Sequence, residues 1–148
     1  MTSVTDALIA DVLGEVKTIA LLGASNKPER ASFRVMQFLL AQGYRVIPVN
    51  PKLSGSELLG QRVYASLDDI PEAIDMVDVF RNASHLPAVV EETIQNRIAT
   101  LWTQLDVVDE VAAQRAREHG IRVVMDRCPA IEWPRLARAG LLPANPTA

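Results

Sequence analysis

The chain has 148 residues, the length of one ordinary domain, and its formal net charge is −3. Apolar residues make up 49% of it and charged residues 22%, a balance typical of globular proteins, and the acidic excess argues against a general nucleic-acid binder. A single cysteine excludes an internal disulfide and a thiolate metal cluster, and with two distant histidines no metal site is expected.

The first residues of the sequence do not predict export, and its apolar runs do not predict membrane insertion. Residues 1–6 lack the basic segment and apolar core of a signal peptide. No apolar run approaches the about 20 residues that span a bilayer. We therefore expect a cytoplasmic protein with neither a membrane nor a nucleic acid as partner.

The first half of the chain alternates apolar runs with amphipathic stretches of helical length. Periodicity predicts a helix over 6–16 and a buried strand over 17–22. A helix over 33–42 follows, and Gly43 stands where a left-handed C-terminal cap would fall. The next strand, 45–49, contains a proline, which indicates the edge of a sheet.

The second half repeats this alternation. The predicted elements are a loop over 53–62, a short strand at 63–64, a short helix over 67–72, strands over 76–80, 100–103 and 121–125, helices capped by Ser84 and by Asp109, and a short helix over 133–139. This order predicts the α/β class: a Rossmann-like, doubly wound, mostly parallel sheet of five or six strands with helices on both faces. We expect one domain over residues 1–142 and a frayed tail over 143–148.

In such a sheet, ligands bind beyond the carboxyl ends of the strands. After the first strand, Gly23 allows a sharp turn, and the next helix directs its positive end at the same place. Ser25 and Ser32 add hydroxyl groups, and Lys27 and Arg30 add charge, so the sequence favours a phosphate site. The alternative is a tight connection in which Ser32 caps the helix. The three-glycine dinucleotide fingerprint is absent.

The loop after the second strand contains Asn50, Pro51 and Lys52. NAD-binding domains usually place an acid here to hold the ribose, so NAD is disfavoured while NADP stays open. Lys52 suits a ribose phosphate. The alternative is that Asn50 and Pro51 only form a turn.

Polar side chains also follow the later strands. Phe80 either covers a ligand or belongs to the core, Arg81 faces a phosphate or a carboxylate, and Gln104 can hydrogen-bond an amide. Asp78 lies inside an apolar strand, where a carboxyl must be hydrogen-bonded or paired. We assign Arg127 a structural role, paired with Asp78 or with Asp126.

Two segments together, 18–32 and 43–51, resemble the CoA-binding domain family, small stand-alone proteins related to the N-terminal domain of the succinyl-CoA synthetase α subunit. The motifs are Gly-Ala-Ser with Pro-x-Arg-x-Ser, and then Pro-Val-Asn-Pro. The likeness continues through 66–67, 75–81, 101–104 and 123–128, and covers nearly the whole chain.

The resemblance implies a Rossmann-type domain that binds coenzyme A or an acyl-CoA. Three groups of residues follow from it. The residues expected to bind the cofactor are Gly23, Ala24, Ser25, Lys27, Pro28, Arg30 and Ser32 around the phosphates, Asn50, Pro51 and Lys52 with Phe80 and Arg81 near the adenosine end, and Gln104 near the pantetheine arm.

The sequence departs from the family pattern at two points. Asp106 stands where a glycine is expected, so the loop shifts or an acid intrudes on the pantetheine path. The synthetase domain with the phosphorylated histidine has no counterpart, and His85 and His119 match no catalytic position. Since no catalytic constellation is present either, we expect binding that is non-catalytic or depends on a partner.

Other functions stay open. The chain could be an NADP-dependent oxidoreductase, a nucleotide-binding subunit of a larger enzyme, or a degenerate domain that serves as an interaction surface. A homodimer or an unidentified protein partner is also open. Cys128 follows the last strand, and we consider a mixed disulfide with the CoA thiol as a hypothesis.

Overall fold

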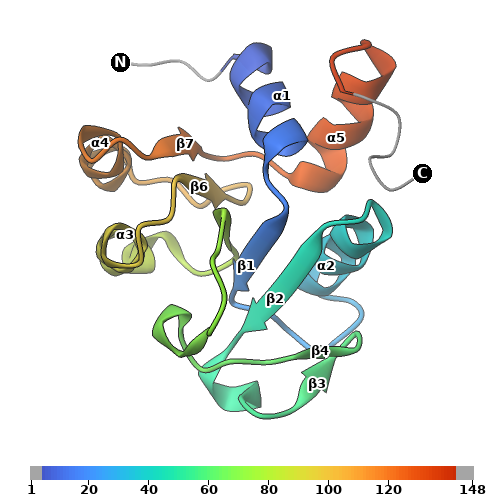
Figure 1. Ribbon diagram of the computed structural model, residues 1–148, viewed down its shortest axis with the longest axis vertical. Coiled ribbons are helices and arrows are strands. Elements are labelled where there is room, and N and C mark those ends of the chain that lie inside the picture. The colour runs from blue at the N-terminus through green and yellow to red at the C-terminus, as the bar shows by residue number, and fades with distance from the viewer. Residues whose placement is uncertain (1–4, 143–148) are drawn as a thin grey trace.

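The computed structural model describes residues 5–142, and five parallel strands form its central sheet in the order β2-β1-β5-β6-β7 (Figure 1). The strand order reverses at β1, because β2 lies on one side of it and β5 on the other. This confirms the predicted Rossmann-like α/β class. The strands are β1 Thr18–Leu22, β2 Arg45–Val49, β5 Met76–Val79, β6 Thr100–Thr103 and β7 Arg122–Val124.

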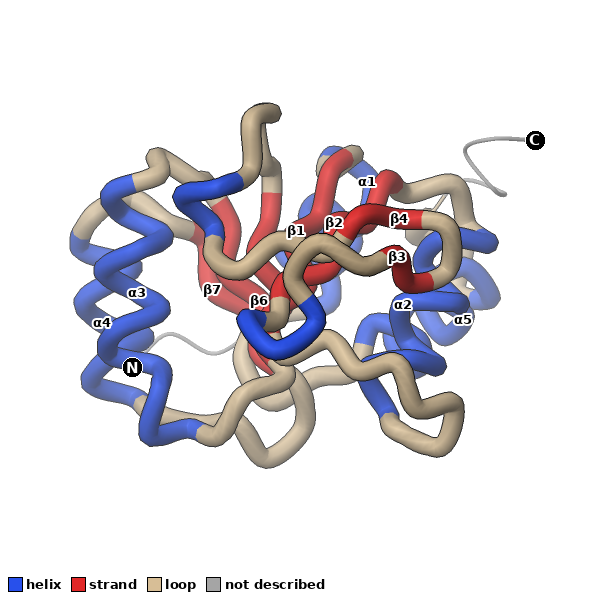
Figure 2. Tube along the Cα trace, turned by 90° about the horizontal axis from the view of Figure 1, so that it is seen from below, coloured by secondary structure: helices blue, strands red, loops and turns tan. Residues whose placement is uncertain are grey.

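Helices cover both faces of the sheet. Figure 2 shows α3 and α4 on one side of the strands and α2 and α5 on the other. Apolar side chains of α1 pack on the same side as those of α2 and α5. The helices are α1 Asp6–Glu15, α2 Ala31–Ala41, α3 Leu86–Gln95, α4 Glu110–Glu118 and α5 Pro129–Arg138.

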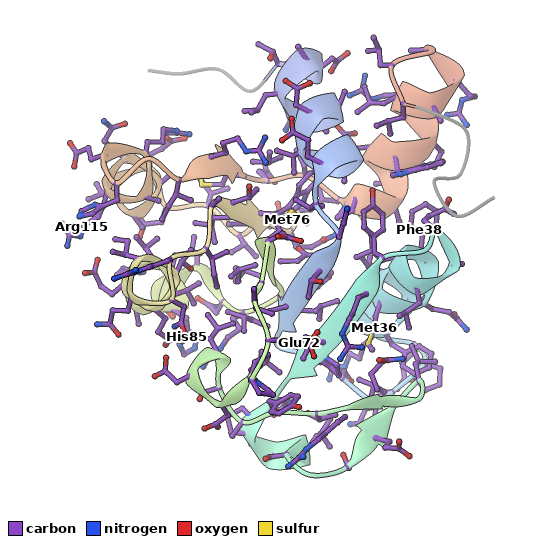
Figure 3. All side chains as sticks on the ribbon, viewed as in Figure 1. Met36, Phe38, Glu72, Met76, His85 and Arg115 are labelled. Carbon is purple, nitrogen blue, oxygen red and sulfur yellow. The ribbon has the colours of Figure 1, made fainter. Side chains whose placement is uncertain are left out.

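The apolar side chains of the central strands alternate between two cores. In β1, Ile19 and Leu21 belong to the core under α1, α2 and α5, which we call the first core, whereas Ala20 and Leu22 belong to the second core under α3 and α4. Met36 of α2 and Met76 of β5 both belong to the first core, while Arg115 of α4 is exposed at the outer surface (Figure 3). A strand buried on both faces therefore needs the continuous apolar run that the sequence contains.

The start of α2 bears on the candidate site. The helix begins at Ala31, two residues earlier than the predicted 33–42, so Ser32 lies inside it and does not cap it. Arg30 occupies the N-cap position and its side chain accepts no capping hydrogen bond. At the other end, Gly43 has φ 99°, which confirms the left-handed cap.

The segment after β2 was predicted as a loop over 53–62, and this is wrong in part. It contains a 3-10 turn, Pro51–Leu53, and the antiparallel pair β3 Glu57–Leu58 and β4 Gln61–Arg62. Leu59 and Gly60 connect the two strands with φ 50° and 79°, the signature of a tight hairpin. The sequence hides this hairpin because leucine is unusual at a left-handed position.

Three further boundaries differ from prediction. The helix over 67–72 is a 3-10 turn, Leu67–Asp69, since the residue before Pro71 disfavours helical backbone. Ser84 caps no helix: Asn82 Oδ1 accepts the Ser84 N–H at 2.9 Å and starts the 3-10 turn Ala83–His85 before α3. Helix α5 begins at Pro129, four residues before the predicted position.

Other predictions are confirmed. Asp109 caps α4 by accepting the Ala112 N–H at 3.0 Å. Strand β2 lies at the sheet edge, as its Pro48 indicated, and Tyr64 adds a single bridge to Val49. No helix between residues 5 and 142 is long and apolar enough to cross a membrane. The predicted tail, 143–148, lies outside the described residues, so the boundary at 142 stays a prediction.

Candidate functional site

The carboxyl ends of β1, β2 and β5 meet at the point where the strand order reverses. The Phe80 N–H donates to Leu22 O at 2.8 Å, which extends the β1–β5 register and sets Phe80 beside Gly23. The N–H groups of Gly23 and Ala24 both donate to Val49 O, at 3.1 and 3.2 Å. Three strand ends are thus joined at one place, where this fold class binds ligands.

Gly23 is required by its backbone and by its neighbours. Its φ is 85°, in the region that favours glycine. A Cβ at this position would lie 3.0 Å from Phe80 O and 3.2 Å from Arg81 Cγ. The small residue after β1 therefore brings the β1 and β5 loops into close contact.

A cavity of about 500 Å³ opens between the β1–α2 loop and the loop after β2. Nine of the thirteen predicted cofactor-binding residues line it, and they come from the loops that follow β1, β2 and β5 and from the first turn of α2. Its lining is Gly23, Ala24, Ser25, Asn26, Lys27, Arg30, Ala31, Ser32, Asn50, Lys52, Leu53 and Phe80.

The charge around this first cavity is positive. Lys27, Arg30 and Lys52 are exposed, and no ion pair among residues 5–142 uses any of them. By contrast, Arg45, Arg115, Arg122, Arg127 and Arg135 each contact a carboxylate.

The amino end of α2 faces the same cavity through Ala31 and Ser32. The N–H groups of these two residues and of Phe33 have no backbone acceptor in the described chain. Since Arg30 supplies no side-chain cap, the first helical turn keeps free donors and the positive end of its dipole. The arrangement can hold an anionic group with donors from the first turn of α2, whereas the N–H groups of Gly23 and Ala24 are already bonded.

The Asn50 side chain links the loop after β1 to the loop after β2 by hydrogen bonds. Its Nδ2 donates to Ala24 O at 2.7 Å and its Oδ1 accepts the Lys52 N–H at 2.9 Å. Ser25 Oγ accepts the Lys27 N–H at 3.1 Å in the same way. The Asn50 side chain thus forms the turn that the alternative interpretation predicted. Asn50 also lines the cavity, so its predicted role in ligand binding stays a prediction.

A second cavity, of about 380 Å³, lies on the α3 side of β1 and shares Gly23, Asn50 and Lys52 with the first. Pro51 and Arg81, both predicted, line it. Burial raises the pKa of Glu92, Asp68 raises it further, and Arg81 opposes this shift. The rest of the lining is Leu22, Val49, Ala65, Ser66, Leu67 and Glu92.

Pro28 and Gln104 line neither cavity. Pro28 is exposed in the loop between Lys27 and Arg30. Gln104 is buried, its N–H donates to Val79 O at 3.1 Å, and its Oε1 has no hydrogen-bond partner among the described residues. Gln104 therefore lies next to Phe80 in the sheet, one strand beyond the first cavity.

Several lining residues were not predicted. Asn26, Ala31 and Leu53 are chain neighbours of predicted residues, so a wider window would include them. Ser66 and Leu67 were marked only by the family likeness. Ala65 and Glu92 have no local signal at all, because the packing of α3 and of the segment after β4 brings them to the cavity.

Asp106, which stands where the family pattern has glycine, was expected either to shift its loop or to intrude on the pantetheine path. Its φ is 69°, so an aspartate occupies a backbone that favours glycine. Its N–H donates to Asp126 Oδ1 at 2.8 Å, and Asp126 itself has φ 64°. Asp106 is exposed and lines neither cavity, so the acid does not intrude on either of them.

The predicted pairing of Asp78 with Arg127 is wrong. Asp78 is fully buried, neither of its carboxylate oxygens has a partner among the described residues, and burial raises its pKa to about 8. Arg127 instead donates to the Asp126 carbonyl at 3.0 Å and lies 3.6 Å from the Glu132 carboxylate. Cys128 is a free, buried thiol that lines neither cavity, so its mixed disulfide stays a hypothesis.

Comparison with known proteins adds a family match. A family model described as a CoA binding domain matches residues 17–134. The uncharacterized protein YneT of Bacillus subtilis is 38% identical over 128 residues, which cover 86% of this chain and 93% of YneT. The α subunit of acetate–CoA ligase (ADP-forming) I of Pyrococcus furiosus is 29% identical over 128 residues, which cover 77% of this chain and 28% of that subunit.

Solved structures agree with the fold. A hypothetical protein from Pyrococcus horikoshii superposes with a TM-score of 0.86 at 40% identity, covering 91% of this chain and 94% of that one. A protein from Thermus thermophilus gives a TM-score of 0.85 at 40% identity, covering 90% of this chain and 99% of that one.

Proposed function

The chain belongs to the CoA binding domain family, and on that premise we propose that it binds coenzyme A or an acyl-CoA without transforming it alone. One observation favours this ligand above others. Lys27, Arg30 and Lys52 surround one cavity at the open end of α2 and form no ion pair among the described residues. Cations without a carboxylate partner at a helix amino end suit a ligand rich in phosphate.

Coenzyme A has phosphate at two places, the pyrophosphate and the ribose 3′-phosphate. We assign the pyrophosphate to the amino end of α2, with Ser25, Lys27, Arg30 and Ser32 around it. Gly23 and Ala24 form the tight turn beneath it, and Pro28 holds the loop. These side chains come from one loop and the first turn of one helix, so one continuous segment positions them.

The adenosine end is assigned to the loop after β2 and to the second cavity. Asn50, Pro51 and Lys52 lie between the two cavities, and Arg81 lines the second. Phe80 lies beside Gly23 and supplies an apolar surface. The pantetheine arm is assigned to Gln104, whose neighbour in the sheet is Phe80.

We propose that any chemistry on the bound thioester needs groups from outside this CoA-binding domain. The chain spans 28% of the length of the acetate–CoA ligase subunit that it matches. Within residues 5–142, no group of three or more His, Cys, Asp or Glu side chains could hold a metal ion. Binding, presentation or sensing of CoA is therefore the activity to test first.

Calorimetric titration of the purified protein with CoA, acetyl-CoA, NAD and NADP tests the proposal. We expect binding of CoA and acetyl-CoA and no heat from the two nicotinamide cofactors. Binding of NADP without CoA would move the protein to the oxidoreductase class. Silence toward all four ligands would favour the interaction-surface alternative.

Arg30→Glu tests the phosphate assignment. The substitution turns a charge-assisted contact into a repulsion, so we expect CoA affinity to fall by at least about 30-fold, equivalent to roughly 2 kcal/mol. Arg138→Glu on α5 makes the same charge change at an exposed residue that lines neither cavity, and it should leave affinity within about twofold. Equal effects of the two variants would refute the assignment.

A further inference from the structure

The side chains of Asp78 and Gln104 have buried oxygens without a hydrogen-bond donor among residues 5–142. Between residues 5 and 142, the buried side-chain nitrogen and oxygen atoms without a partner are Asp78 Oδ1, Asp78 Oδ2 and Gln104 Oε1. All three are oxygens, and two side chains provide them. Unpartnered buried polar atoms are rare and costly, so three at one place need an explanation.

The sheet register places these side chains on one face. Asp78 of β5 lies beside Trp102 of β6, and Gln104 follows Trp102 by two residues. Side chains two apart in a strand lie on the same face, and Trp102 and Met76 both belong to the first core. From the rise and spacing of strands, the two Cα atoms are about 8 Å apart, within reach of an aspartate and a glutamine side chain.

Among residues 5–142, no charged side chain forms an ion pair with Asp78. The ionisable groups on the elements that cover this face belong to α1, α2, α5 and the residues before α5. Among them, Glu132 is buried beside Arg127 and Arg135. The remaining groups are Asp6, Asp11 and Glu15 of α1, Arg34 of α2, Tyr44 after it, Asp126 and Cys128 before α5 and Arg138 at its end.

A proton on Asp78 would resolve the conflict. Burial, with no charged neighbour contributing, raises the pKa of this carboxyl to about 8, so the neutral acid is the form present at neutral pH. A protonated carboxyl has one O–H donor, whereas an ionised one only accepts. With that proton, the three acceptors become one donor and two acceptors.

We propose that Asp78 donates this proton to Gln104 Oε1 and so directs the Gln104 amide nitrogen toward the bound ligand. The proposal rests on the proposed function, because it concerns the path of the pantetheine arm. Gly23, Phe80 and Gln104 occupy adjacent positions along the carboxyl edge of β1, β5 and β6, so a ligand extended from the first cavity crosses Phe80 to reach Gln104.

The chemistry of the contact follows from this orientation. An amide N–H₂ donates, and the pantetheine arm offers amide carbonyl oxygens as acceptors. When Asp78 is ionised, it can only accept, and the Gln104 nitrogen then turns inward to it. Asp78 is thus a positioning residue that acts through Gln104 and need not touch the ligand.

The test compares two ligands over pH 6.5 to 9.5. Acetyl-CoA contains the pantetheine arm without a free thiol, whereas adenosine 3′,5′-bisphosphate lacks the arm. We expect the affinity of wild type for acetyl-CoA to fall about fivefold as the pH rises through Asp78 titration, the loss of about one neutral hydrogen bond. The affinity for the bisphosphate should show no such step.

Variants separate a positioning role from a structural one. Asp78→Asn keeps a donor at every pH, so acetyl-CoA affinity should stay high and the pH step should vanish. Asp78→Leu removes the donor, so affinity should be about fivefold weaker at every pH. In a Gln104→Leu background, substitution of Asp78 should have no further effect.

Each alternative outcome is distinct. Acetyl-CoA binding by wild type that is independent of pH and unchanged in Asp78→Leu overturns this inference and leaves the proposed function intact. Equal losses for acetyl-CoA and for the bisphosphate would show that Asp78 acts only through the fold. If wild type binds no acetyl-CoA at pH 7, the proposed function fails and the inference falls with it. The pH titration of wild type needs no variant to fold.

Discussion

At the scale of single residues, the site depends on Gly23, where the loops after β1 and β5 come into close contact. Gly23 combines a left-handed backbone with a Phe80 carbonyl 3.0 Å from where a Cβ would lie. Gly55 has almost the same φ, 86°, but nothing within 4 Å of its added Cβ. Comparing substitutions at these two glycines therefore separates the free-energy cost of a left-handed backbone from the cost of a steric clash.

Gly23→Ala should lower the free energy of unfolding by more than Gly55→Ala does. Both variants force alanine into the left-handed region, at about 1–2 kcal/mol each. Gly23→Ala adds a clash with backbone atoms that cannot rotate away, so we expect a loss of roughly 3 kcal/mol. Urea denaturation measures both, and equal midpoints would contradict the crowding seen at Gly23.

Some residues of the site could be predicted from the sequence and others could not. Gly23, Lys27, Arg30 and Lys52 could be named from their positions after strands, because the carboxyl edge of a parallel sheet is where ligands bind. Glu92 could not, since a helix distant in sequence brings it to the second cavity. The isolation of Asp78 also depends on which groups fail to reach it, and a sequence does not contain that information.

At the scale of elements, helix starts were the least predictable features. Asn82, and not Ser84, begins the turn before α3, because its side chain accepts the N–H two residues on. Both residue types favour helix starts, so the sequence does not separate them. Helix α5 shows the same difficulty: its Pro129 is a normal first residue, yet the apolar period becomes clear only later.

Asn82→Ala and Ser84→Ala test this correction. Loss of the Asn82 cap leaves the Ser84 N–H without its acceptor and should lower the free energy of unfolding by about 1 kcal/mol. Ser84→Ala removes an exposed hydroxyl and keeps the backbone N–H, so we expect a change within about 0.5 kcal/mol. Chemical denaturation of the two variants decides it, and a larger loss for Ser84→Ala would restore the predicted cap.

At the scale of the whole molecule, Asp78 makes stability depend on pH. Below about pH 4 both the folded and the unfolded state hold its proton. Between there and about pH 8 the unfolded state has released the proton and the folded state has kept it. The folded state then binds more protons, so the free energy of unfolding falls as the pH rises through this window.

Asp78→Asn should remove this dependence. Relative to the variant, wild type should lose about 1 kcal/mol of unfolding free energy for each pH unit between roughly 5 and 7.5. Denaturant titrations of the two proteins at four pH values measure the difference, in which all other titrating groups cancel. A difference that stays constant with pH would show that the folded state does not retain the Asp78 proton.

The sequence by itself determined the fold class, because apolar runs of strand length alternating with amphipathic stretches allow few arrangements other than a parallel sheet between helices. It also determined the loop with Gly23, Lys27 and Arg30, because those residues follow the first strand directly. The tertiary structure alone decided which cations of residues 5–142 lack partners within that range, that a second cavity joins the first, and that Asp78 and Gln104 face one core with no donor from the described residues. The physical reason is that pairing and burial depend on distances between segments far apart in the chain, and those distances exist only once the sheet has formed.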